Sequence, residues 1–322
     1  MDEYPLLRNL ITSGHQLQNF DDRHYIFYAV GSRFTRLVRR LSRPGLLQKF
    51  NRDILSYVEV MKPSHLIYFK AVGLHPETIM AAKRLGATTV GIFPDLDPRI
   101  YGKDYLRTLR ETDFLFHTKP NLIEFFQDQI HTDANFVYPF FDPSQIEVPL
   151  AADEKIGVSF VGHWSIGKEK SLIKFSSLYT GNVSIFGEGW KETKFSGLRA
   201  NVSVNGPVYG SAIQNIYRRS ICVLGFLMEK VSAQGKNDEI TSRSILVPAS
   251  GGVLLHQKTK AACTLFKESS SLLFSDISHA VSLAEEIKGN NKLRIKLASK
   301  QQHDVLKAAT NPKIFLQNLG IS

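Results

Sequence analysis

The sequence predicts an α/β protein built from two parallel-sheet domains, and three observations carry this prediction. The length of 322 residues suits two domains at roughly 150 residues each. Short apolar runs alternate with segments of helical period along most of the chain, which is typical of doubly wound parallel sheets. With 43% hydrophobic and 11% aromatic residues, the chain can form two ordinary cores and is not a disordered or low-complexity protein.

In the first half, the apolar runs are rich in β-branched and aromatic residues, as in strands that are buried on both faces. These runs are HLIYF (65–69), TTVGIF (88–93), DFLFHT (113–118) and NFVYPF (135–140). Segments 76–87 and 119–130 lie between them and have a helical period. This half therefore predicts strands and helices in regular alternation.

Segment 139–155 has three prolines and little periodicity, which predicts an interdomain linker. Alternation then resumes, with strands predicted at 157–162, 182–187, 221–226 and 251–256. Segment 278–309 is mostly helical, and 311–320 predicts a last helix. The predicted organisation is a first domain at 1–143, a linker at 144–156, a second domain at 157–310 and a C-terminal helix at 311–322.

Several classes of protein are excluded by composition. The N-terminus has no apolar run of signal-peptide length, and the longest apolar stretch, 244–255, is too short for a bilayer. Cys222 and Cys263 cannot form a disulfide framework, so we expect reduced cysteines in a cytoplasmic protein. The net charge of +10 leaves nucleic acid, an anionic membrane surface or a phosphate-bearing small ligand as partners.

Candidate site residues follow from the position of the strands, because ligands of open parallel sheets bind beyond the carboxyl ends of the strands. In the first half this rule selects Lys70, Gly73, Asp95, Asp97, His117, Lys119 and Asp142, and in the second it selects His163, Trp164, 188–190, Gly206, Gly225 and Phe226.

The loop SFVGHWSIGKEKS (159–171) follows a predicted strand and opens a helix. Gly162 allows close backbone approach, and Lys168 and Lys170 in the first helical turn suit a diphosphate. The alternative is an ordinary strand-turn-helix with solvated lysines. The loop lacks Walker-type or GxGxxG spacing, so nucleotide binding of those kinds is not supported.

Segment 236–252 places Asp238, Glu239 and Arg243 just before a mostly apolar stretch, a plausible grip on a ligand. Alternatively, the two acids begin a helix and complement its dipole. Asp95 and Asp97, in PDLDPRIYG (94–102), are candidate general bases at a strand end, or residues that only set a turn.

The run 31–52 is basic and contains no acid. Its arginines, among them Arg36, Arg39 and Arg40, are interleaved with apolar residues and could contact an anionic lipid or a phosphorylated acceptor. The alternative is a solvated helix face. The ten histidines show no HxH or HExxH spacing, so we expect no catalytic metal, and no GxSxG elbow indicates a covalent hydrolase.

Taken together and in order, several segments resemble the CgeB-like (spore-maturation-type) glycosyltransferases, which have the GT-B architecture of two Rossmann-like domains facing across a cleft. The match covers nearly the whole chain. It includes HLIYFKAVGLHPETIMAAKRLGATTVGIFPDLDP and ETDFLFHTKPNLIEFF in the first half, and SFVGHWSIGKEKSLIKF, VSIFGEGW, VNGPVYGSAIQNIYRRSICVLGF and TSRSILVPASGGVLLHQKTKAACTLF in the second.

This resemblance implies transfer of a sugar from a nucleotide-sugar donor, held by the second domain, to an acceptor on the first. Lys168 falls where the family usually has an arginine, and Arg243 matches the arginine of its Arg-x-Phe-Glu segment. Asp95 and Asp97 fall at the family's Asp-Pro turn beside the cleft. The donor residues implied are Gly162, His163, Lys168, Gly187, Asp238, Glu239, Arg243, Gly251 and Gly252.

The chain departs from the family pattern at three places. Leu246 replaces the glutamate expected to hold the donor ribose hydroxyls, and leucine cannot accept those hydrogen bonds. At the position of a second glutamate that is usual in the family, this chain has Ser270 or Ser271. The chain starts inside what should be the family's first helix, with LLRNLITSGHQLQNFD as the matching stretch, so the family's first strand and its Gly-rich turn are missing. We therefore expect a misassigned start, a fragment, or another segment in that place.

The resulting hypothesis is a metal-independent hexosyltransferase of polysaccharide biosynthesis, with no permanent cofactor and a UDP-, GDP- or dTDP-sugar as substrate. Lys168, the Gly162 loop and Arg243 would neutralise the leaving diphosphate. Asp95 or Asp97, and after them His117, would deprotonate a hydroxyl of a glycan, a lipid-linked sugar or a protein or spore-surface glycan. We expect a cytoplasmic protein, with peripheral contact to an anionic membrane through 31–52.

Two other classes stay open. A catalytically silent GT-B module that binds a nucleotide-sugar or a partner glycosyltransferase is favoured by Leu246 and the missing strand. A nucleic-acid-binding protein is favoured only by the net charge, and no RRM, KH, zinc-finger or helix-turn-helix pattern supports it, so no nucleic acid is expected.

Overall fold

A computed structural model describes residues 4–21, 25, 33–153, 155–227, 237–308 and 311–321, except for the side chains of 33–42. The chain divides into two compact units. We call Ser13–Val137 the N-terminal unit, and Tyr138–Ser322 together with Met1–Thr12 the C-terminal unit. The domain limits expected from the sequence, at 143–144 and 156–157, stay a prediction.

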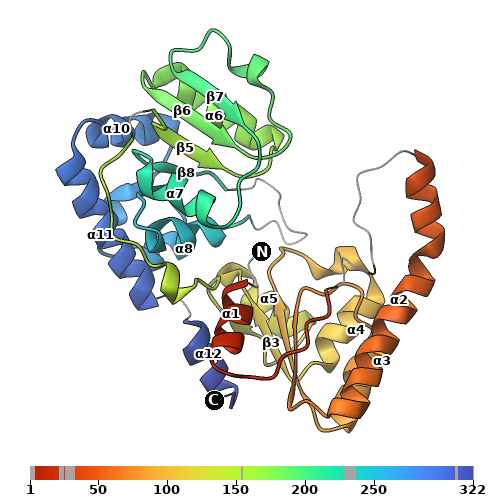
Figure 1. Cartoon of the computed structure of the whole chain (residues 1–322). Coiled ribbons are helices and arrows are strands. Elements are labelled where there is room, and N and C mark those ends of the chain that lie inside the picture. The colour runs from red at the N-terminus through yellow and green to blue at the C-terminus, as the bar shows by residue number, and fades with distance from the viewer. Residues whose placement is uncertain are drawn as a thin grey trace. The chain divides into compact units, whose positions relative to one another are not determined.

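The N-terminal unit contains a four-stranded parallel sheet in the order β1-β2-β3-β4, of which β3 is labelled in Figure 1. Its elements are α2 (Arg33–Met61), β1 (His65–Phe69), α3 (Pro76–Arg84), β2 (Thr88–Phe93), the 3₁₀ helix η2 (Pro98–Tyr101), α4 (Lys103–Glu111), β3 (Phe114–His117), η3 (Pro120–Leu122), α5 (Ile123–Gln129) and β4 (Asn135–Phe136). Among the described residues before His65 the structure has helices and no strand, so β1 is an edge strand.

Strand β2 is the most deeply buried strand of this sheet, with five of its six residues buried. Gly91 within it faces Tyr68 of the neighbouring strand, and a Cβ at Gly91 would lie 2.5 Å from the tyrosine ring. Tyr68 in turn hydrogen-bonds Thr112 at 2.6 Å. A glycine in the middle of an otherwise β-branched run therefore makes room for a buried aromatic ring of the adjacent strand.

The C-terminal unit contains a six-stranded parallel sheet in the order β10-β9-β8-β5-β6-β7. Its elements are α1 (Tyr4–Thr12), η4 (Pro143–Gln145), β5 (Val158–Val161), α6 (Ile166–Leu178), β6 (Asn182–Phe186), η5 (Glu192–Phe195), β7 (Asn201–Asn205), α7 (Ser211–Arg219), β8 (Val223–Gly225), α8 (Ser242–Ala249), β9 (Leu254–Gln257), α9 (Lys260–Leu265), η6 (Ser270–Leu272), β10 (Leu273–Phe274), α10 (Ile277–Ile287), α11 (Asn291–Ala308) and α12 (Pro312–Asn318). Helix α1 packs on α12, although the two lie at opposite ends of the sequence.

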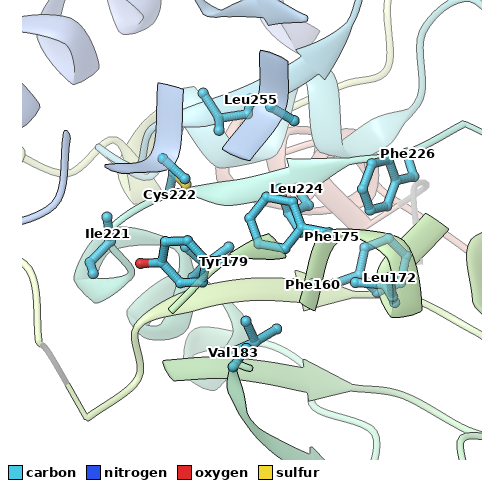
Figure 2. Close-up of a cluster of buried hydrophobic side chains, with 14 of the residues drawn as sticks. Phe160, Leu172, Phe175, Tyr179, Val183, Ile221, Cys222, Leu224, Phe226 and Leu255 are labelled. Carbon is cyan, nitrogen blue, oxygen red and sulfur yellow. The ribbon is translucent and has the colours of Figure 1, made fainter. Parts of the chain in front are cut away.

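Both faces of this six-stranded sheet are covered, as successive residues of its strands show. Leu255 and Leu224 belong to one buried cluster, which α6 and α10 complete, and Figure 2 shows part of it. The residues just before them, Leu254 and Val223, belong to a second cluster, with side chains of α7, α8 and α9. Because successive strand residues point to opposite faces, the sheet lies between two helical layers and is doubly wound.

Three strands differ from the sequence expectation. The run 135–140 forms a strand only at Asn135–Phe136, because Pro139 follows and has no N–H group to continue the ladder. Strands β7 and β10 were not predicted. The β7 sequence NVSVN is polar at alternate positions and only partly buried at the sheet edge, and β10 has two residues, so neither resembles a run buried on both faces.

Candidate functional site

The six-stranded sheet has its switch point between β5 and β8. From β5 the chain continues outward to β6 and β7, and it then returns to β8 on the other side of β5 before continuing to β9 and β10. Connections on the two sides therefore run in opposite directions and leave room beyond the carboxyl ends of these strands. Open α/β sheets bind ligands at this position.

Arg243 spans this switch point. It lies in the first turn of α8, where Thr241 and Ser244 form a capping box. Its guanidinium donates from Nη1 to the carbonyl of Val161, the last residue of β5, at 3.0 Å, and from Nη2 to the carbonyl of Phe226, just beyond β8, at 2.8 Å. The planar fork thus ties together the ends of two neighbouring strands.

Phe160 and burial also act on Arg243. The guanidinium carbon lies 4.7 Å from the centre of the Phe160 ring, a cation–π contact. Burial lowers the pKa of Arg243, while Tyr217 and Asp238 act in the opposite direction. The sequence did not single out Phe160, because a buried aromatic residue in a strand is also an ordinary core residue.

Lys168 is a second, buried cation near Arg243. It lies in the first turn of α6, and its ammonium donates to the carbonyl of His163 at 3.2 Å. Burial and the charge of Arg243 together lower the pKa of Lys168 to about 8, although Asp238 acts in the opposite direction. The structure therefore brings two predicted donor residues and the Asp238 carboxylate into one electrostatic group, with an excess of positive charge.

Gly162 and Gly187 bring the loops after β5 and β6 together. The Gly162 N–H donates to the carbonyl of Phe186 at 2.9 Å, and its carbonyl accepts from the Trp190 indole at 2.8 Å. Gly187 has φ of 145°, and a Cβ there would lie 2.2 Å from the Gly162 carbonyl oxygen. Only glycine at 187 permits this approach of two backbones at the edge where Arg243 lies.

His163 and Trp164 continue the loop after β5 on its exposed side. The His163 ring lies 4.0 Å from the Glu188 carboxylate, and both side chains are mainly exposed. Trp164 is 43% exposed, and its indole donates to Glu169 at 2.7 Å. An exposed but hydrogen-bonded aromatic ring thus lies on this loop.

Three other predicted donor residues have packing contacts. Glu239 accepts a hydrogen bond from the backbone of Ala261 at 2.8 Å, in the first turn of α9. A Cβ at Gly251 would lie 2.7 Å from the carbonyl of Glu147, and one at Gly252 would lie 2.6 Å from the carbonyl of Tyr217. These contacts explain the three residue types without a ligand, and donor binding by them stays a prediction.

In the N-terminal unit, the carboxyl ends of β1, β2 and β3 are followed or ended by Lys70, Asp95 and His117. The Lys70 ammonium lies 2.7 Å from the Asp95 carboxylate, and the Tyr101 hydroxyl donates to the same carboxylate. Burial opposes the charge of Lys70, but hydrogen bonds to Asp95 and Tyr101 outweigh it and raise the pKa of Lys70. Tyr101 was not selected from the sequence, because η2 turns it back toward Asp95.

Asp97 and His117 have different surroundings. The Asp97 carboxylate caps η2 by accepting from the Arg99 backbone at 3.0 Å, and it also accepts from the Arg99 guanidinium at 3.0 Å. His117 is fully buried, and its Nδ1 accepts from the Lys119 backbone at 2.7 Å. Burial, helped by Lys119, holds the pKa of His117 well below its usual value, so its imidazole is neutral.

The remaining predicted contacts are in helix α2. Arg36, Arg39 and Arg40 lie within its backbone range, as the basic amphipathic pattern predicted a helix there. Their side chains lie outside the described residues, so their contact with an acceptor or a membrane stays a prediction.

Residues 169–317 match the sequence profile of a family described as glycosyl transferase-like. No curated protein sequence matches the chain significantly. Among solved structures, an α-glucosyltransferase in complex with UDP and a 13-mer DNA is 13% identical, with a TM-score of 0.65 over 99% of this chain and 94% of that one.

Anabaena HepE in complex with UDP and glucose is 11% identical, with a TM-score of 0.61 over 98% of this chain and 87% of that one. S. aureus TarM, in a complex that contains UDP, is 13% identical, with a TM-score of 0.58 over 84% of this chain and 58% of that one. This chain has the GT-B fold. Its two parallel sheets, of four and six strands, confirm the fold class predicted from the sequence.

Within this GT-B chain, the structure shows the surroundings of Leu246, Ser270 and Ser271, the residues at the two positions where the family usually has glutamate. Leu246 is half-buried and packs against the cluster formed by α7, α8 and α9. Ser270 and Ser271 are exposed on η6. None of these side chains can replace the acceptor oxygens of a glutamate carboxylate in geometry and charge.

The described part of the chain has neither a cluster of metal-ligating side chains nor a membrane-spanning helix. Among those residues, no group of three or more His, Cys, Asp or Glu side chains is arranged to hold a metal ion. No helix within the described ranges is both long and apolar enough to cross a membrane.

Proposed function

We propose that this protein is a glycosyltransferase that moves a sugar from a nucleotide-sugar donor to an acceptor hydroxyl without a metal ion. The observation that carries the proposal is the pair of cations at the switch point of the C-terminal sheet, the buried Lys168 and the partly buried Arg243. Arg243 lies within the segment 169–317 that matches a glycosyl transferase-like family, and Lys168 directly precedes this segment. A nucleoside diphosphate is an anion of the size and charge that such a site stabilises.

In the proposed reaction, the acceptor oxygen forms a bond to the anomeric carbon of the donor sugar. The bond from that carbon to the diphosphate oxygen breaks, and its electron pair leaves with the diphosphate. Lys168 and Arg243 stabilise the charge that grows on the leaving group, and this stabilisation is stronger in a partly buried site than in water. Asp238 supports the donor sugar or the positive charge that develops at its anomeric carbon.

Among the three predicted bases, Asp95 is the one that the contacts favour. Its side chain is 36% exposed and is therefore open to an acceptor. The Asp97 carboxylate is occupied as a helix cap, and its side chain is 12% exposed. His117 is fully buried, so it could touch a substrate only after rearrangement of the core. We therefore assign the acceptor proton to Asp95.

The finer details of the proposal come from the sequence resemblance. They are membership of the CgeB-like group, a glycan or lipid-linked acceptor in polysaccharide biosynthesis, and a cytoplasmic location with membrane contact through 31–52. The solved structures with UDP or UDP-glucose make UDP the first donor nucleotide to test, ahead of GDP and dTDP. DNA belongs in the acceptor panel because one of these structures contains it.

A nucleotide panel tests the donor class. We expect one nucleoside diphosphate among UDP, GDP and dTDP to raise the melting temperature, with CMP as a monophosphate comparison, because binding to the native state alone stabilises it. Purified protein should then hydrolyse or transfer the sugar of the matching donor. Absence of binding by all three diphosphates would contradict the proposed donor site.

Leu246 favours a second candidate, a silent GT-B module that binds a nucleotide-sugar without turnover. Leucine cannot accept hydrogen bonds from the ribose hydroxyls that the missing glutamate is expected to hold. Calorimetric binding of the nucleotide together with no hydrolysis or transfer across the donor panel would favour this candidate. Turnover of any donor above the background of Arg243→Ala protein would exclude it.

Lys168 predicts a pH dependence of donor binding. The pKa of Lys168 is about 8 in the free protein, and a bound diphosphate favours the charged lysine and raises that pKa. Affinity for the nucleoside diphosphate should therefore be highest below pH 8 and should fall as the pH rises through that value. Isothermal titration calorimetry between about pH 7 and 9 measures this slope.

Lys174 is the matched control for that measurement, because it lies further along the same helix and is exposed. Lys168→Ala should weaken binding and flatten the pH dependence, whereas Lys174→Ala should keep both the affinity and the slope. Equal slopes in the parent and in Lys168→Ala would remove Lys168 from the donor site.

A further inference from the structure

The turn after β1 has an unusual backbone. Lys70 and Ala71 have positive φ values of 62° and 37°, in a region where residues with a Cβ are rare. The turn is held by hydrogen bonds from the Lys70 N–H to the Ile92 carbonyl at 2.8 Å and from the Ala71 N–H to the Phe69 carbonyl at 2.7 Å. The Tyr105 hydroxyl donates to the Lys70 carbonyl. Strain that neighbours enforce in this way is concentrated at functional sites.

This strained turn brings a cation to Asp95. The Lys70 ammonium lies 2.7 Å from the Asp95 Oδ2 atom and 5.2 Å from the centre of the Tyr101 ring. The Tyr101 hydroxyl donates to the same Oδ2 atom. Tyr101 ends η2, the short helix that Asp97 caps at its start. The strand end, the helix and its cap thus hold one carboxylate oxygen with two donors.

We propose that Lys70 and Tyr101 are positioning residues that keep the Asp95 carboxylate ionised and oriented to accept a proton. This inference rests on the proposed function, in which Asp95 takes the proton of the acceptor hydroxyl while the new glycosidic bond forms. Two hydrogen bonds to the charged form of an acid favour that form over the neutral acid. The second carboxylate oxygen, Oδ1, is the atom that receives the proton.

Other ionisable groups around Asp95 do not replace Lys70. The His117 ring is buried and neutral, so it adds no charge. The cation nearest to His117, Lys119, interacts with that ring. Arg99 is paired with Asp97, and each neutralises the charge of the other. The remaining titratable neighbour is Tyr105, which hydrogen-bonds the Lys70 carbonyl. Among the described residues, Lys70 is therefore the cation in direct contact with Asp95.

Lys70→Asn tests the proposal without a folding penalty at this turn, because asparagine tolerates positive φ better than most residues with a Cβ. Asparagine removes the positive charge beside Asp95, and an opposite charge at this distance favours the charged form of a carboxyl group. The acidic limb of the pH profile of kcat/KM should therefore move to higher pH. Lys70→Arg should restore the limb of the parent.

Protonation of the Asp95 carboxylate can also be followed without an activity measurement. The carboxyl carbon of Asp95 can be followed by ¹³C NMR titration, with Asp95→Asn to assign its signal. An unchanged Asp95 titration in Lys70→Asn would overturn the proposed positioning role. A shifted titration with an unmoved acidic limb would retain the Lys70 contact but overturn Asp95 as the base, so the two failures are distinguishable.

Lys83 provides a matched control in the same unit. Its ammonium lies 2.8 Å from the Asp113 carboxylate, and the two side chains are exposed to a similar degree as those of Lys70 and Asp95. Lys83→Gln should raise the pKa of Asp113 and leave the acidic limb of kcat/KM in place. An equal displacement of that limb by Lys83→Gln would overturn the proposal, because it would show a general effect of charge.

Tyr101→Phe separates the hydroxyl from the ring. The phenyl ring keeps its place beside Lys70, while the donor to Asp95 is removed. The acidic limb should shift in the same direction as for Lys70→Asn but by less, about half a unit. A shift to lower pH would contradict the role of the Tyr101 hydroxyl.

Discussion

Arg243→Ala is expected to lower kcat/KM for sugar transfer by about 100- to 1,000-fold, the range found when one preorganised donor to a developing negative charge is removed. The arginine lies at the sheet's switch point and donates to the carbonyls of Val161 and Phe226 at 3.0 and 2.8 Å. Alanine removes the positive charge and also frees two strand ends that the guanidinium holds together. Steady-state kinetics with the donor identified by the nucleotide panel measures the loss.

Two further variants separate charge from geometry. Arg243→Lys keeps the charge, but an ammonium cannot reproduce the planar fork to both carbonyls, so we expect activity between those of the parent and Arg243→Ala. Arg219→Ala is the control, because Arg219 pairs with Asp153 on the surface of the same unit. It should keep the kcat/KM of the parent. Parental kcat/KM in folded Arg243→Ala protein would show that the donor site lies elsewhere.

Arg294→Ala is expected to destabilise the C-terminal unit by about 3 kcal/mol, because removal of the side chain leaves buried carbonyl groups without donors. Arg294 is fully buried in α11. Its Nε atom donates to the Ser220 carbonyl at 2.8 Å and its Nη2 atom to the Arg218 carbonyl at 2.5 Å, while Nη1 donates to the carbonyl of Leu150.

The arginine therefore satisfies carbonyl groups at the C-terminal end of α7 and holds Leu150 against the C-terminal unit. Burial lowers the pKa of Arg294 to about 10, which still leaves its guanidinium charged at neutral pH. A cation without a carboxylate partner among these contacts is stabilised by carbonyl dipoles at a helix C-terminus. That geometry needs donors in three directions, which lysine could not supply from a similar position.

Tryptophan fluorescence measures this unit, since both tryptophans of the chain, Trp164 and Trp190, lie in it and Trp190 is buried. The unfolding transition of Arg294→Ala should fall by roughly 6 to 12 °C. Lys296→Ala, two positions along the same helix and exposed, should stay within about 1 °C of the parent. A transition for Arg294→Ala within that same margin would contradict the role of the carbonyl contacts.

The fold could be predicted from the sequence largely because its signals are local. The runs at 65–69, 88–93 and 182–187 are continuous and apolar, which strands buried on both faces require, and the structure has strands at β1, β2 and β6. The prediction failed where this signal is weak, at the polar edge strand β7 and at the two-residue β10.

The candidate site was predictable only in part. The strand-end rule and the family resemblance pointed to Lys168, Arg243 and Asp95 as residue types at suitable positions. The rule could not show that Arg243 hydrogen-bonds Val161, which is 82 positions away in sequence. It also could not decide which of Asp95 and Asp97 is the better candidate base. Both aspartates lie in the same turn after a strand, and they differ only in their hydrogen-bond and ion-pair partners.

By itself, the sequence determined the number and kind of the sheets, because the period of apolar residues along a strand or helix reports which faces are buried. Only the tertiary structure decided which side chains meet at the ends of those strands. In the folded chain, Asp97 caps a helix, whereas Asp95 forms an ion pair with Lys70 and accepts a hydrogen bond from Tyr101. The physical reason is that a hydrogen bond or ion pair depends on distances of a few ångströms between segments that only folding brings together.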